Sequence, residues 1–417
     1  IPNGHRPVEP HTVVPLPAHR APPFEIHTVN TSPDDDDVGR SEAATSAGSP
    51  RSGFRCQRDC QNGAPPLVSN YTKQLVKRFT AAVCFRSGCM EALARQRLDQ
   101  SAAVLMYHRV LRPGQIALSF SHPGIIVALE SFEAQMAFLK KRFRLLSIDE
   151  FEFYYRGQKR LPPRSCLITF DDGWIDNFEN AAPVLEKHAI PSLIFLSVDF
   201  IGTKKRFWQE RFRSALTALH PNKARYEGAI EAMDLEAAFK NRFVQIRHYS
   251  EDLFHEALSN SISDLKSQPV GRIEDNIETL EMAMNPNEKR KLGDSDFINW
   301  QMVSEMCSKD VFDFGSHGCS HQLMTSPDTD LRRETAESKK TIEDRLGSTI
   351  TSFSYPNGSY NQDCIQAVRA SGYRLAFSTN FGLADTSTSP FEINRINIHQ
   401  SACNTLPLFY GRLLNLW

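Results

Sequence analysis

The sequence predicts an α/β fold in which parallel strands are joined by helices. Short apolar runs such as 104–107, 166–170 and 193–196 have the length of buried strands. Helical patterns separate these runs, and strands that alternate with helices pair in parallel through crossover helices. Residues that can carry chemistry follow several of the runs directly, at the end of the predicted strand.

The expected elements follow one another from residue 102 to the C-terminus. Strands are expected at 104–107, 166–170, 193–196, 311–314, 350–354, near 375–378 and at 393–398. Helices are expected at 132–139, 178–187, from 300 onward, 331–346 and 364–371. Between about 203 and 296 the strand pattern stops, and charged helical stretches such as 235–243 and 277–284 predict a helical insertion.

Composition restricts the class of protein. The 417 residues are 41% hydrophobic and 23% charged, the balance of an ordinary globular protein. Lys and Arg number 48 against 49 Asp and Glu, so the basic excess typical of nucleic-acid binders is absent and no nucleic acid is expected as a partner. No apolar run reaches the roughly 18 residues of a membrane-spanning helix, and no signal-peptide pattern is visible at the start. These features favour a cytoplasmic or membrane-peripheral protein.

Changes in composition divide the chain into three parts. Residues 1–66 hold 11 of the 24 prolines and a run of four Asp, which predicts a disordered tail. Residues 67–100 form a predicted amphipathic helical segment, because apolar residues such as Leu75 and Phe79 recur at helical spacing among Lys and Arg. This segment is expected to cover a core, with peripheral membrane contact through 67–86 as the alternative. The main domain is expected at 101–417.

Two adjacent carboxylates, Asp171 and Asp172, follow the predicted strand 166–170 directly. Like charges this close need a cation or a shared proton if the strand is central, because each raises the pKa of the other. Asp-Gly is also a common turn pair, so on its own the cluster is more often a turn.

A second cluster contains His317 and His321, again after an apolar run. The His-x-x-x-His spacing lets two imidazoles reach one divalent ion. The Glu that follows the first His in metalloproteases is missing. In a chain with 13 His, a pair at this spacing also has a plain structural reading.

Two further clusters end predicted strands. One is the Tyr-Pro-Asn-Gly turn within 353–358, and the other is 394–399, which contains Arg395 and His399. Taken alone, the first cluster indicates only a turn, and His399 in the second is more often a structural histidine. Their shared position changes this interpretation, because the carboxyl ends of parallel strands are where sites are assembled from separate loops. Carboxylates and imidazoles gathered at that edge indicate metal-assisted hydrolysis.

Taken together, the motifs resemble a known family. In their order they are similar to the polysaccharide deacetylases with a NodB homology domain, carbohydrate esterase family four: Thr-Phe-Asp-Asp-Gly at 169–173, His-x-x-x-His at 317–321, Phe-x-Tyr-Pro-x-Gly at 353–358, and the late Arg395 and His399. Leu-Met-Tyr-His-Arg-Val at 105–110 and the run 300–306 are similar to the bacterial exopolysaccharide branch, which includes de-N-acetylases of poly-N-acetylglucosamine. The resemblance covers roughly 101–202 and 297–410. It implies that 101–417 is a catalytic domain folded as a distorted (β/α) barrel with fewer than eight strands.

The resemblance also implies roles for single residues. It makes Asp172, His317 and His321 the ligands of one divalent metal ion, with Zn2+ preferred and Co2+ or Ni2+ able to substitute. It makes Asp171 the general base and His399 the general acid.

The same resemblance assigns the Tyr355 backbone N–H to the oxyanion. Arg395 is expected beside Asp171, because this chain has Thr351 and Ser352 where many members carry an arginine before the Tyr-Pro turn. The Asp-Trp motif that follows this turn in the family is not evident.

The implied activity is removal of N-acetyl groups from N-acetylhexosamine units of a polysaccharide or oligosaccharide, with release of acetate. Trp174, Tyr355 and Pro356 are expected to contact this substrate, and Trp174 and Trp208 could stack on sugar rings, although aromatic residues are more often core. Two alternatives stay open: a metal-dependent amidase or acyl hydrolase of another substrate, and a non-catalytic glycan-binding member of the same fold. The sequence does not determine an oligomeric state.

Overall fold

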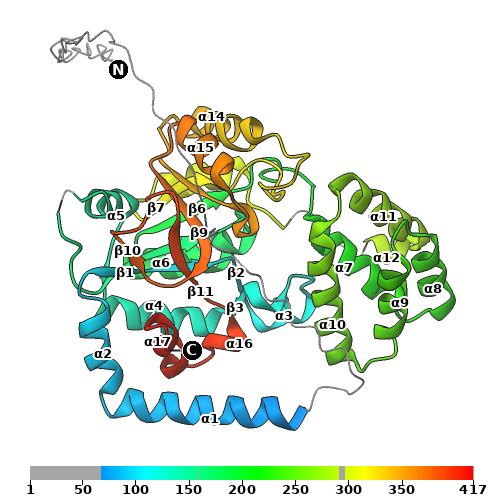
Figure 1. The fold of residues 1–417 in the computed structure, drawn as a ribbon, viewed down its shortest axis with the longest axis horizontal. Helices are drawn as coiled ribbons and strands as arrows, with labels where there is room; N and C mark the ends of the chain where they lie inside the picture. Colours follow the sequence, from blue (N-terminus) through cyan, green and yellow to red (C-terminus); the bar gives the residue numbers. More distant parts are fainter. Residues whose placement is uncertain (1–66, 158, 291–295, 417) are drawn as a thin grey trace, which may run out of the picture. The chain divides into compact units, whose positions relative to one another are not determined.

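The structure is a computed structural model that describes residues 67–157, 159–290 and 296–416 (Figure 1). Its strands are β1 Ser101–Tyr107, β2 Arg109–Leu111, β3 Ile126–Ala128, β4 Arg144–Leu145, β5 Ser165–Phe170, β6 Ser192–Leu196, β7 Phe312–Ser316, β8 Ser352–Ser354, β9 Leu375–Phe381, β10 Ala384–Asp385 and β11 Ile393–Asn397. The predicted tail 1–66 lies outside the described residues.

The helices precede, separate and follow these strands. They are α1 Leu67–Arg86, α2 Cys89–Arg97, α3 Pro113–Leu118, α4 Leu129–Arg142, α5 Ile148–Tyr155, α6 Ala182–His188, α7 Trp208–Leu219, α8 Lys223–Ala232, α9 Ala237–Ile246, α10 Glu251–Asp264, α11 Val270–Ala283, α12 Pro286–Arg290, α13 Trp300–Cys307, α14 Ser338–Leu346, α15 Gln362–Ala370, α16 Gln400–Cys403 and α17 Leu406–Leu413. Shorter turns are the 3-10 segments η1 Pro123–Ile125, η3 Leu265–Ser267 and η5 Pro356–Gly358, and the π segments η2 Asn177–Ala181 and η4 Arg333–Glu337. None of the described helices combines the length and apolarity needed to cross a bilayer.

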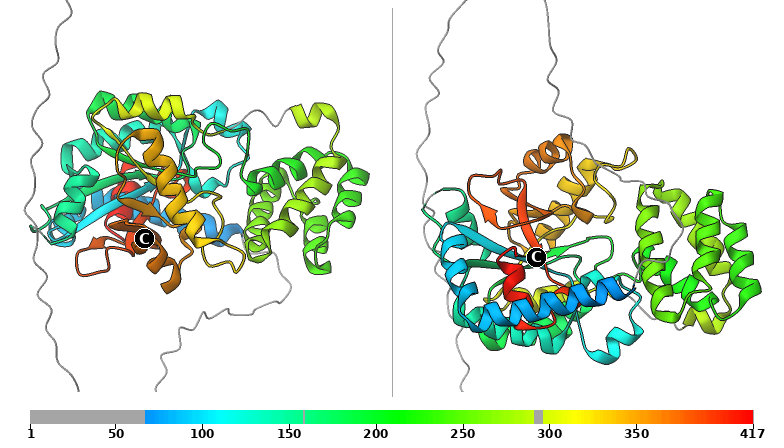
Figure 2. Two further views of the ribbon diagram at one scale, coloured as in Figure 1. Left: turned by 90° about the horizontal axis from the view of Figure 1, so that it is seen from above. Right: turned by 60° about the horizontal axis from the view of Figure 1, so that its bottom comes forward.

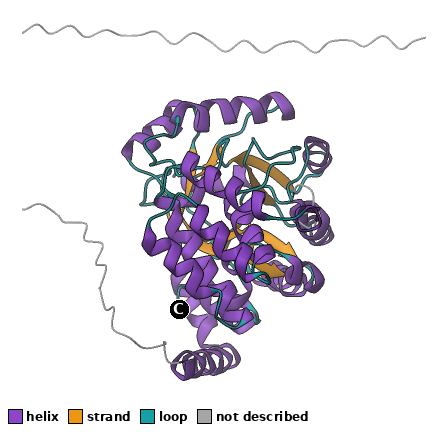
Figure 3. Ribbon diagram, turned by 90° about the vertical axis from the view of Figure 1, so that its right-hand side faces the viewer, coloured by secondary structure: helices purple, strands orange, loops and turns teal. Residues whose placement is uncertain are grey.

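Seven parallel strands close into a barrel. Their order is β1-β11-β9-β8-β7-β6-β5, and β5 pairs with β1 to complete the circle. Strand β4 extends the sheet beside β5, and β10 pairs antiparallel with β1. Figure 3 shows helices covering the outside of these strands. The prediction of a distorted (β/α) barrel with fewer than eight strands is therefore confirmed.

Strand β5 illustrates how alternate positions divide between the two sides of the barrel wall. Leu167 belongs to an apolar cluster with residues of β1, β6, β9 and β11. Ile168 and Phe170 belong to the larger cluster that joins the strands to the surrounding helices. Because strand side chains alternate, Thr169 and Asp171 follow Leu167 on the inner side. The chain thus delivers Asp171 to the barrel interior at the carboxyl end of β5.

The helices α7 to α12 form a bundle with a hydrophobic core of its own, seen in two further views in Figure 2. Large side chains fill that core: Phe212, Leu216, Tyr226, Phe243, Leu258 and Ile277. These helices occupy the range in which the sequence predicts an insertion. The division into a helical segment, a catalytic domain and an insertion stays a prediction.

Helix α1 differs from the expectation that its apolar stripe covers a core. Leu75 is 46% exposed, Phe79 73% and Val83 48%. The helix instead packs through another face, on which Ala81 is fully buried and the Phe85 ring lies 6.2 Å from that of Tyr410. The small Ala81 side chain permits close approach on this face, and the wider apolar stripe is left at the surface.

Candidate active site

The predicted site residues gather at one rim of the barrel because all seven strands are parallel. Asp171 and Asp172 follow β5, His317 follows β7, and the Tyr-Pro-Asn-Gly turn follows β8. Side chains from this rim line a pocket of about 230 Å³. They include His108, Asp171, Asp172, His317, His321 and Asn357.

Asp172, His317 and His321 converge on one point. Asp172 Oδ1 lies 3.4 Å from His317 Nε2 and 3.3 Å from His321 Nε2, and one ligand atom from each of the three residues lies within 4.8 Å of the others. The backbone of Asp172 has a φ of 79°, in the left-handed region, and its carboxylate lines the same pocket as that of Asp171. Asp172 Oδ1 is buried and has no hydrogen bond among the described residues. An orphaned carboxylate oxygen facing two imidazole nitrogens fits a divalent cation.

Hydrogen bonds fix the orientation of two of these three side chains. His317 Nδ1 lies 2.8 Å from the carbonyl oxygen of Ser354, so Nδ1 donates to that oxygen and Nε2 faces the point on which the three side chains converge. Trp174 Nε1 donates to Asp172 Oδ2 over 2.8 Å. Burial alone would raise the pKa of Asp172, but the two histidines hold it well below the usual value. The cluster therefore keeps an ionised carboxylate at its centre.

A buried carboxylate that the sequence analysis missed, Glu334, holds the loop between the two histidines. It accepts the backbone N–H of Cys319 over 2.6 Å, and both the N–H and the hydroxyl of Ser320. Gly318 has a φ of 76°, and a Cβ there would lie 2.5 Å from Glu334 Oε2. A lone Glu in the predicted helix 331–346 belongs to no motif, so no pattern in the sequence indicated this role.

The second carboxylate, Asp171, forms a two-pronged ion pair with Arg395. Arg395 Nη1 and Nη2 lie 2.7 Å from Asp171 Oδ1 and Oδ2, and the arginine is fully buried. Ser354 Oγ accepts a further hydrogen bond from Arg395 Nη2 over 2.8 Å. Burial would raise the pKa of Asp171, but Arg395, followed by His317, overcomes this and the pKa lies below its usual value. The expected position of Arg395 beside Asp171 agrees with the structure.

Trp174 corrects an expectation. Its ring is 1% exposed, with the Phe297 ring stacked at 4.6 Å and the Arg109 guanidinium 4.3 Å from its centroid. Trp174 borders the pocket, but its neighbours leave no exposed ring face on which a sugar could stack, and its contact with a substrate stays a prediction. Trp208 lines a neighbouring groove of about 620 Å³ and is not among the residues that line the pocket.

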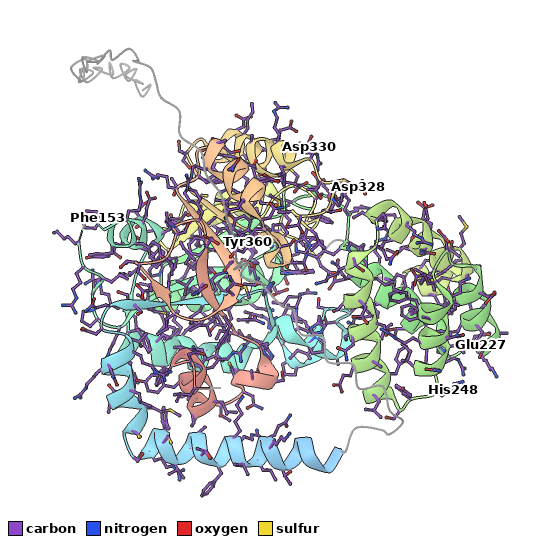
Figure 4. All side chains as sticks on the ribbon, viewed as in Figure 1. Phe153, Glu227, His248, Asp328, Asp330 and Tyr360 are labelled. Atoms are coloured by element: carbon purple, nitrogen blue, oxygen red, sulfur yellow. The ribbon has the colours of Figure 1, made fainter. Side chains whose placement is uncertain are left out.

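The Tyr-Pro turn also corrects expectations. The Tyr355 backbone N–H donates to the Phe377 carbonyl oxygen over 3.1 Å, so it is not available to an oxyanion. Tyr355 is fully buried, and its ring stacks at 4.6 Å on Tyr360, which Figure 4 labels. Pro356 is buried as well, and neither residue lines the pocket. Asn357, the next residue, does line it.

His399 does not line the pocket, whereas His108 does. His399 Nδ1 bonds the Ser401 hydroxyl at 2.8 Å, at the start of α16. His108 Nε2 lies 3.9 Å from Asp171 Oδ2. His399 follows β11 at the start of α16, and within the described residues no hydrogen bond or ion pair joins it to Asp171, so its role as the acid stays a prediction. His108 follows β1 directly within the Leu-Met-Tyr-His-Arg-Val motif, a signal that the sequence analysis left unused.

Comparisons with known proteins find similarity to polysaccharide deacetylases. A family model described as polysaccharide deacetylase matches residues 272–376. YxkH of Bacillus subtilis, which carries the name of a polysaccharide deacetylase, is 22% identical over 296 residues, 71% of this chain and 70% of that protein. The poly-beta-1,6-N-acetyl-D-glucosamine N-deacetylase of Staphylococcus aureus strain MSSA476 is 26% identical over 185 residues, which are 42% of this chain and 57% of that enzyme. The solved structure of IcaB from Ammonifex degensii has a TM-score of 0.48 at 18% identity, covering 76% of this chain and 99% of IcaB.

The buried ion pair predicts a pH-dependent stability difference between the wild type and Arg395→Met. In the wild type the pKa of Asp171 is lowered, so the pair stabilises the fold above the unfolded carboxyl pKa of about 3.9 and this is lost as pH falls through the folded value. In the variant, Arg395 no longer opposes the burial that raises that pKa, so the carboxylate destabilises the fold as pH rises. We expect a loss of about 3–5 kcal/mol of unfolding free energy at pH 7 and a smaller loss near pH 4, measured by urea unfolding.

The control is the double variant Asp171→Asn with Arg395→Met, which removes the buried carboxylate. The double variant also has a lower free energy of unfolding than the wild type, but this difference should increase less from pH 4 to pH 7 than it does for Arg395→Met. A single variant whose deficit is equal at both pH values would mean that Arg395 acts through packing alone.

Proposed function

Because the chain belongs to the polysaccharide deacetylase family and is a hydrolase of carbon–nitrogen bonds other than peptide bonds, we propose that it removes N-acetyl groups from N-acetylhexosamine units of a glycan. The products are acetate and a free amine. One observation carries this proposal: an ionised carboxylate, Asp171, lies in the same pocket as the Asp172, His317 and His321 cluster. A carboxylate base beside a metal-binding cluster is the arrangement that amide hydrolysis needs.

Asp172, His317 and His321 would hold one divalent metal ion, with Zn2+ preferred for these mixed oxygen and nitrogen ligands. Bound there, such an ion polarises an acyl oxygen and lowers the pKa of water. The protein contributes the orientation of its ligands through Ser354, Trp174 and Glu334.

Asp171 is proposed as the general base. Arg395 keeps its carboxylate ionised, and a carboxylate has about four lone-pair sites, so it can still accept a proton from an attacking water while the ion pair holds it in place.

His108 is proposed as the group that protonates the leaving amine. Its Nε2 lies 3.9 Å from Asp171 Oδ2 on the pocket wall. Burial lowers its pKa, and Asp172 and Asp171 oppose this. A proton that Asp171 accepts can therefore pass to His108, and from His108 to the nitrogen of the leaving amine.

The Asn357 backbone is proposed as the oxyanion donor in place of Tyr355. Asn357 lines the pocket with a φ of 54°. Within the described residues, no backbone carbonyl accepts its N–H. A backbone N–H held on a pocket wall by a tight turn can donate to an oxygen that gains negative charge.

The central test is acetate release from acetylated chito-oligosaccharides. We expect the purified protein to release acetate, and His317→Ala to lose both the activity and most of the bound metal, measured by elemental analysis. His248→Ala changes an exposed histidine, labelled in Figure 4, and should retain both. Acetate release by a protein without metal, unaffected by chelators, would refute the metal site. Acyl release only from substrates other than glycans would favour the alternative of a different amidase. A protein that binds metal but hydrolyses neither kind of substrate would favour the alternative of a non-catalytic glycan-binding protein.

The two histidines make a direct comparison. His108→Asn should lower kcat by about 10²-fold or more at unchanged metal content, because the proton donor is lost. His399→Asn should stay within a few-fold of the wild type in the same acetate assay. The reverse ranking would restore His399 to the role that the family resemblance gave it.

Contact with a membrane surface is a further part of the proposal. The exposed apolar stripe of α1 comprises Leu75, Val76, Phe79 and Val83. The helix carries four Lys or Arg and no Asp or Glu. An apolar face with cationic residues on one helix suits the interface of an anionic bilayer.

Vesicle sedimentation tests this contact. The protein should bind phosphatidylcholine vesicles that contain phosphatidylserine, and the double variant Leu75→Gln with Phe79→Gln should lose most of that binding because it removes apolar area from the stripe. Met282→Gln is the matched control, since Met282 is 77% exposed on α11. Equal binding by the double variant and the control would exclude α1 as the contact.

A further inference from the structure

The helical insertion supplies one wall of the catalytic pocket. Its lining residues come from α7, α10 and the turn η3. They are Gln209, Glu210, Arg213, Ser259, Ile262 and Lys266, with Ser263 beside them. The wall therefore comes from a bundle with its own core, which can vary in sequence without disturbing the barrel rim.

Arg213 is the most unusual residue of this wall. It is 6% exposed and borders the pocket. It donates to the backbone oxygen of His255 over 3.3 Å, and no carboxylate of the described residues forms an ion pair with it. Burial lowers its pKa to about 10, and Glu210 opposes this. A guanidinium this deeply buried without a paired anion is costly for the fold.

Lys266 adds a second cation to the same wall. Its Nζ donates to Asn357 Oδ1 over 2.5 Å, which brings the ammonium group next to the proposed oxyanion donor. Burial lowers its pKa, and Asp172 opposes this. Two cations of the insertion thus approach the pocket from the side opposite the barrel strands.

The anions that line the pocket are already engaged. Asp171 is paired with Arg395 through both of its oxygens. Asp172 faces the two histidines and would share the charge of a bound metal ion. Glu210 lies 3.7 Å from Arg109 Nη1 and bonds the Ser121 hydroxyl, while its Oε2 is buried without a hydrogen bond in the described part of the chain. Neither Arg213 nor Lys266 forms an ion pair with a carboxylate of the described residues, so both cations can still pair with an anionic ligand.

We infer that Arg213 and Lys266 form an anion subsite, and that the natural substrate carries an acidic group, a carboxylate or a phosphate, on the N-acetylated sugar or on the sugar next to it. The inference rests on the proposed deacetylase function. A planar guanidinium binds the two oxygens of such a group at once, and an ammonium adds a point charge.

The test uses disaccharides in which N-acetylglucosamine is linked to glucose, to glucuronic acid or to glucose 6-phosphate. Acetate release gives kcat/KM, and calorimetry gives Kd for the same disaccharides without the acetyl group, a readout that needs no turnover. The wild type should prefer an acidic disaccharide over the neutral one by about tenfold or more in both measurements. The preferred acid identifies a carboxylate or a phosphate as the ligand.

Arg213→Met should abolish this preference by lowering kcat/KM for the acidic disaccharide more than for the neutral one, while Arg213→Lys retains part of it. Lys266→Met should lower the preference in the same direction. Lys205→Met is the control. It removes one positive charge as well, but from an exposed lysine that lines the neighbouring groove. Equal affinity of the wild type for acidic and neutral disaccharides, or equal losses on both in Arg213→Met, would overturn the subsite. Selective binding without acetate release would instead contradict the proposed function and leave the subsite standing.

Discussion

The ion pair between Asp171 and Arg395 connects β5 and β11 across the interior of the barrel. Asp171 ends β5 and Arg395 lies in β11, and each of these strands pairs with β1, so the pair spans the seam at which the barrel closes. Ser354 at the end of β8 and Thr169 in β5 bond the same guanidinium. A fully buried charge pair is stable only when its remaining donors are satisfied, and here residues of β5, β8 and β9 accept from the guanidinium of Arg395.

The need to hold these charged groups together also explains why residues with strained backbone conformations lie around the site. Three non-glycine residues of the pocket, Asp172, His321 and Asn357, have φ values of 79°, 56° and 54°. Conformations of this kind cost about 1–3 kcal/mol each and persist where the surroundings fix them. Trp174 holds the carboxylate of Asp172, and Lys266 bonds the side chain of Asn357. The alternation of β5 alone would send Asp171 and Asp172 to opposite sides of the wall, and the left-handed turn at Asp172 brings both into one pocket.

The alternation of strands and helices predicted parallel strands with the chemical clusters on one rim, and the resemblance to the deacetylase family implied the barrel and the grouping of Asp172, His317 and His321. Sequence reasoning failed where the outcome depends on a partner distant in sequence. The Tyr355 N–H is taken by Phe377, and Arg109 and Phe297 cover Trp174. None of these contacts leaves a pattern in the local sequence.

His108 and His399 show the same limit for two residues at one rim. Each follows a barrel strand, and β1 and β11 are neighbours, so position along the strand does not distinguish them. The difference lies in the next turn. After His399 the chain starts α16, and Ser401 binds the imidazole there, whereas after His108 strand β2 begins at once.

The insertion adds a different kind of control over the same chemistry. The barrel rim fixes Asp171 and the metal-binding cluster by buried hydrogen bonds, and a substitution there alters the reaction itself. The insertion wall reaches the pocket with Arg213 and Lys266, whose helices are held by a separate apolar core. The wall and the rim have separate apolar cores and meet through polar contacts such as that of Lys266 with Asn357. Under the proposed function, the wall can therefore alter substrate choice with less effect on the geometry of the rim.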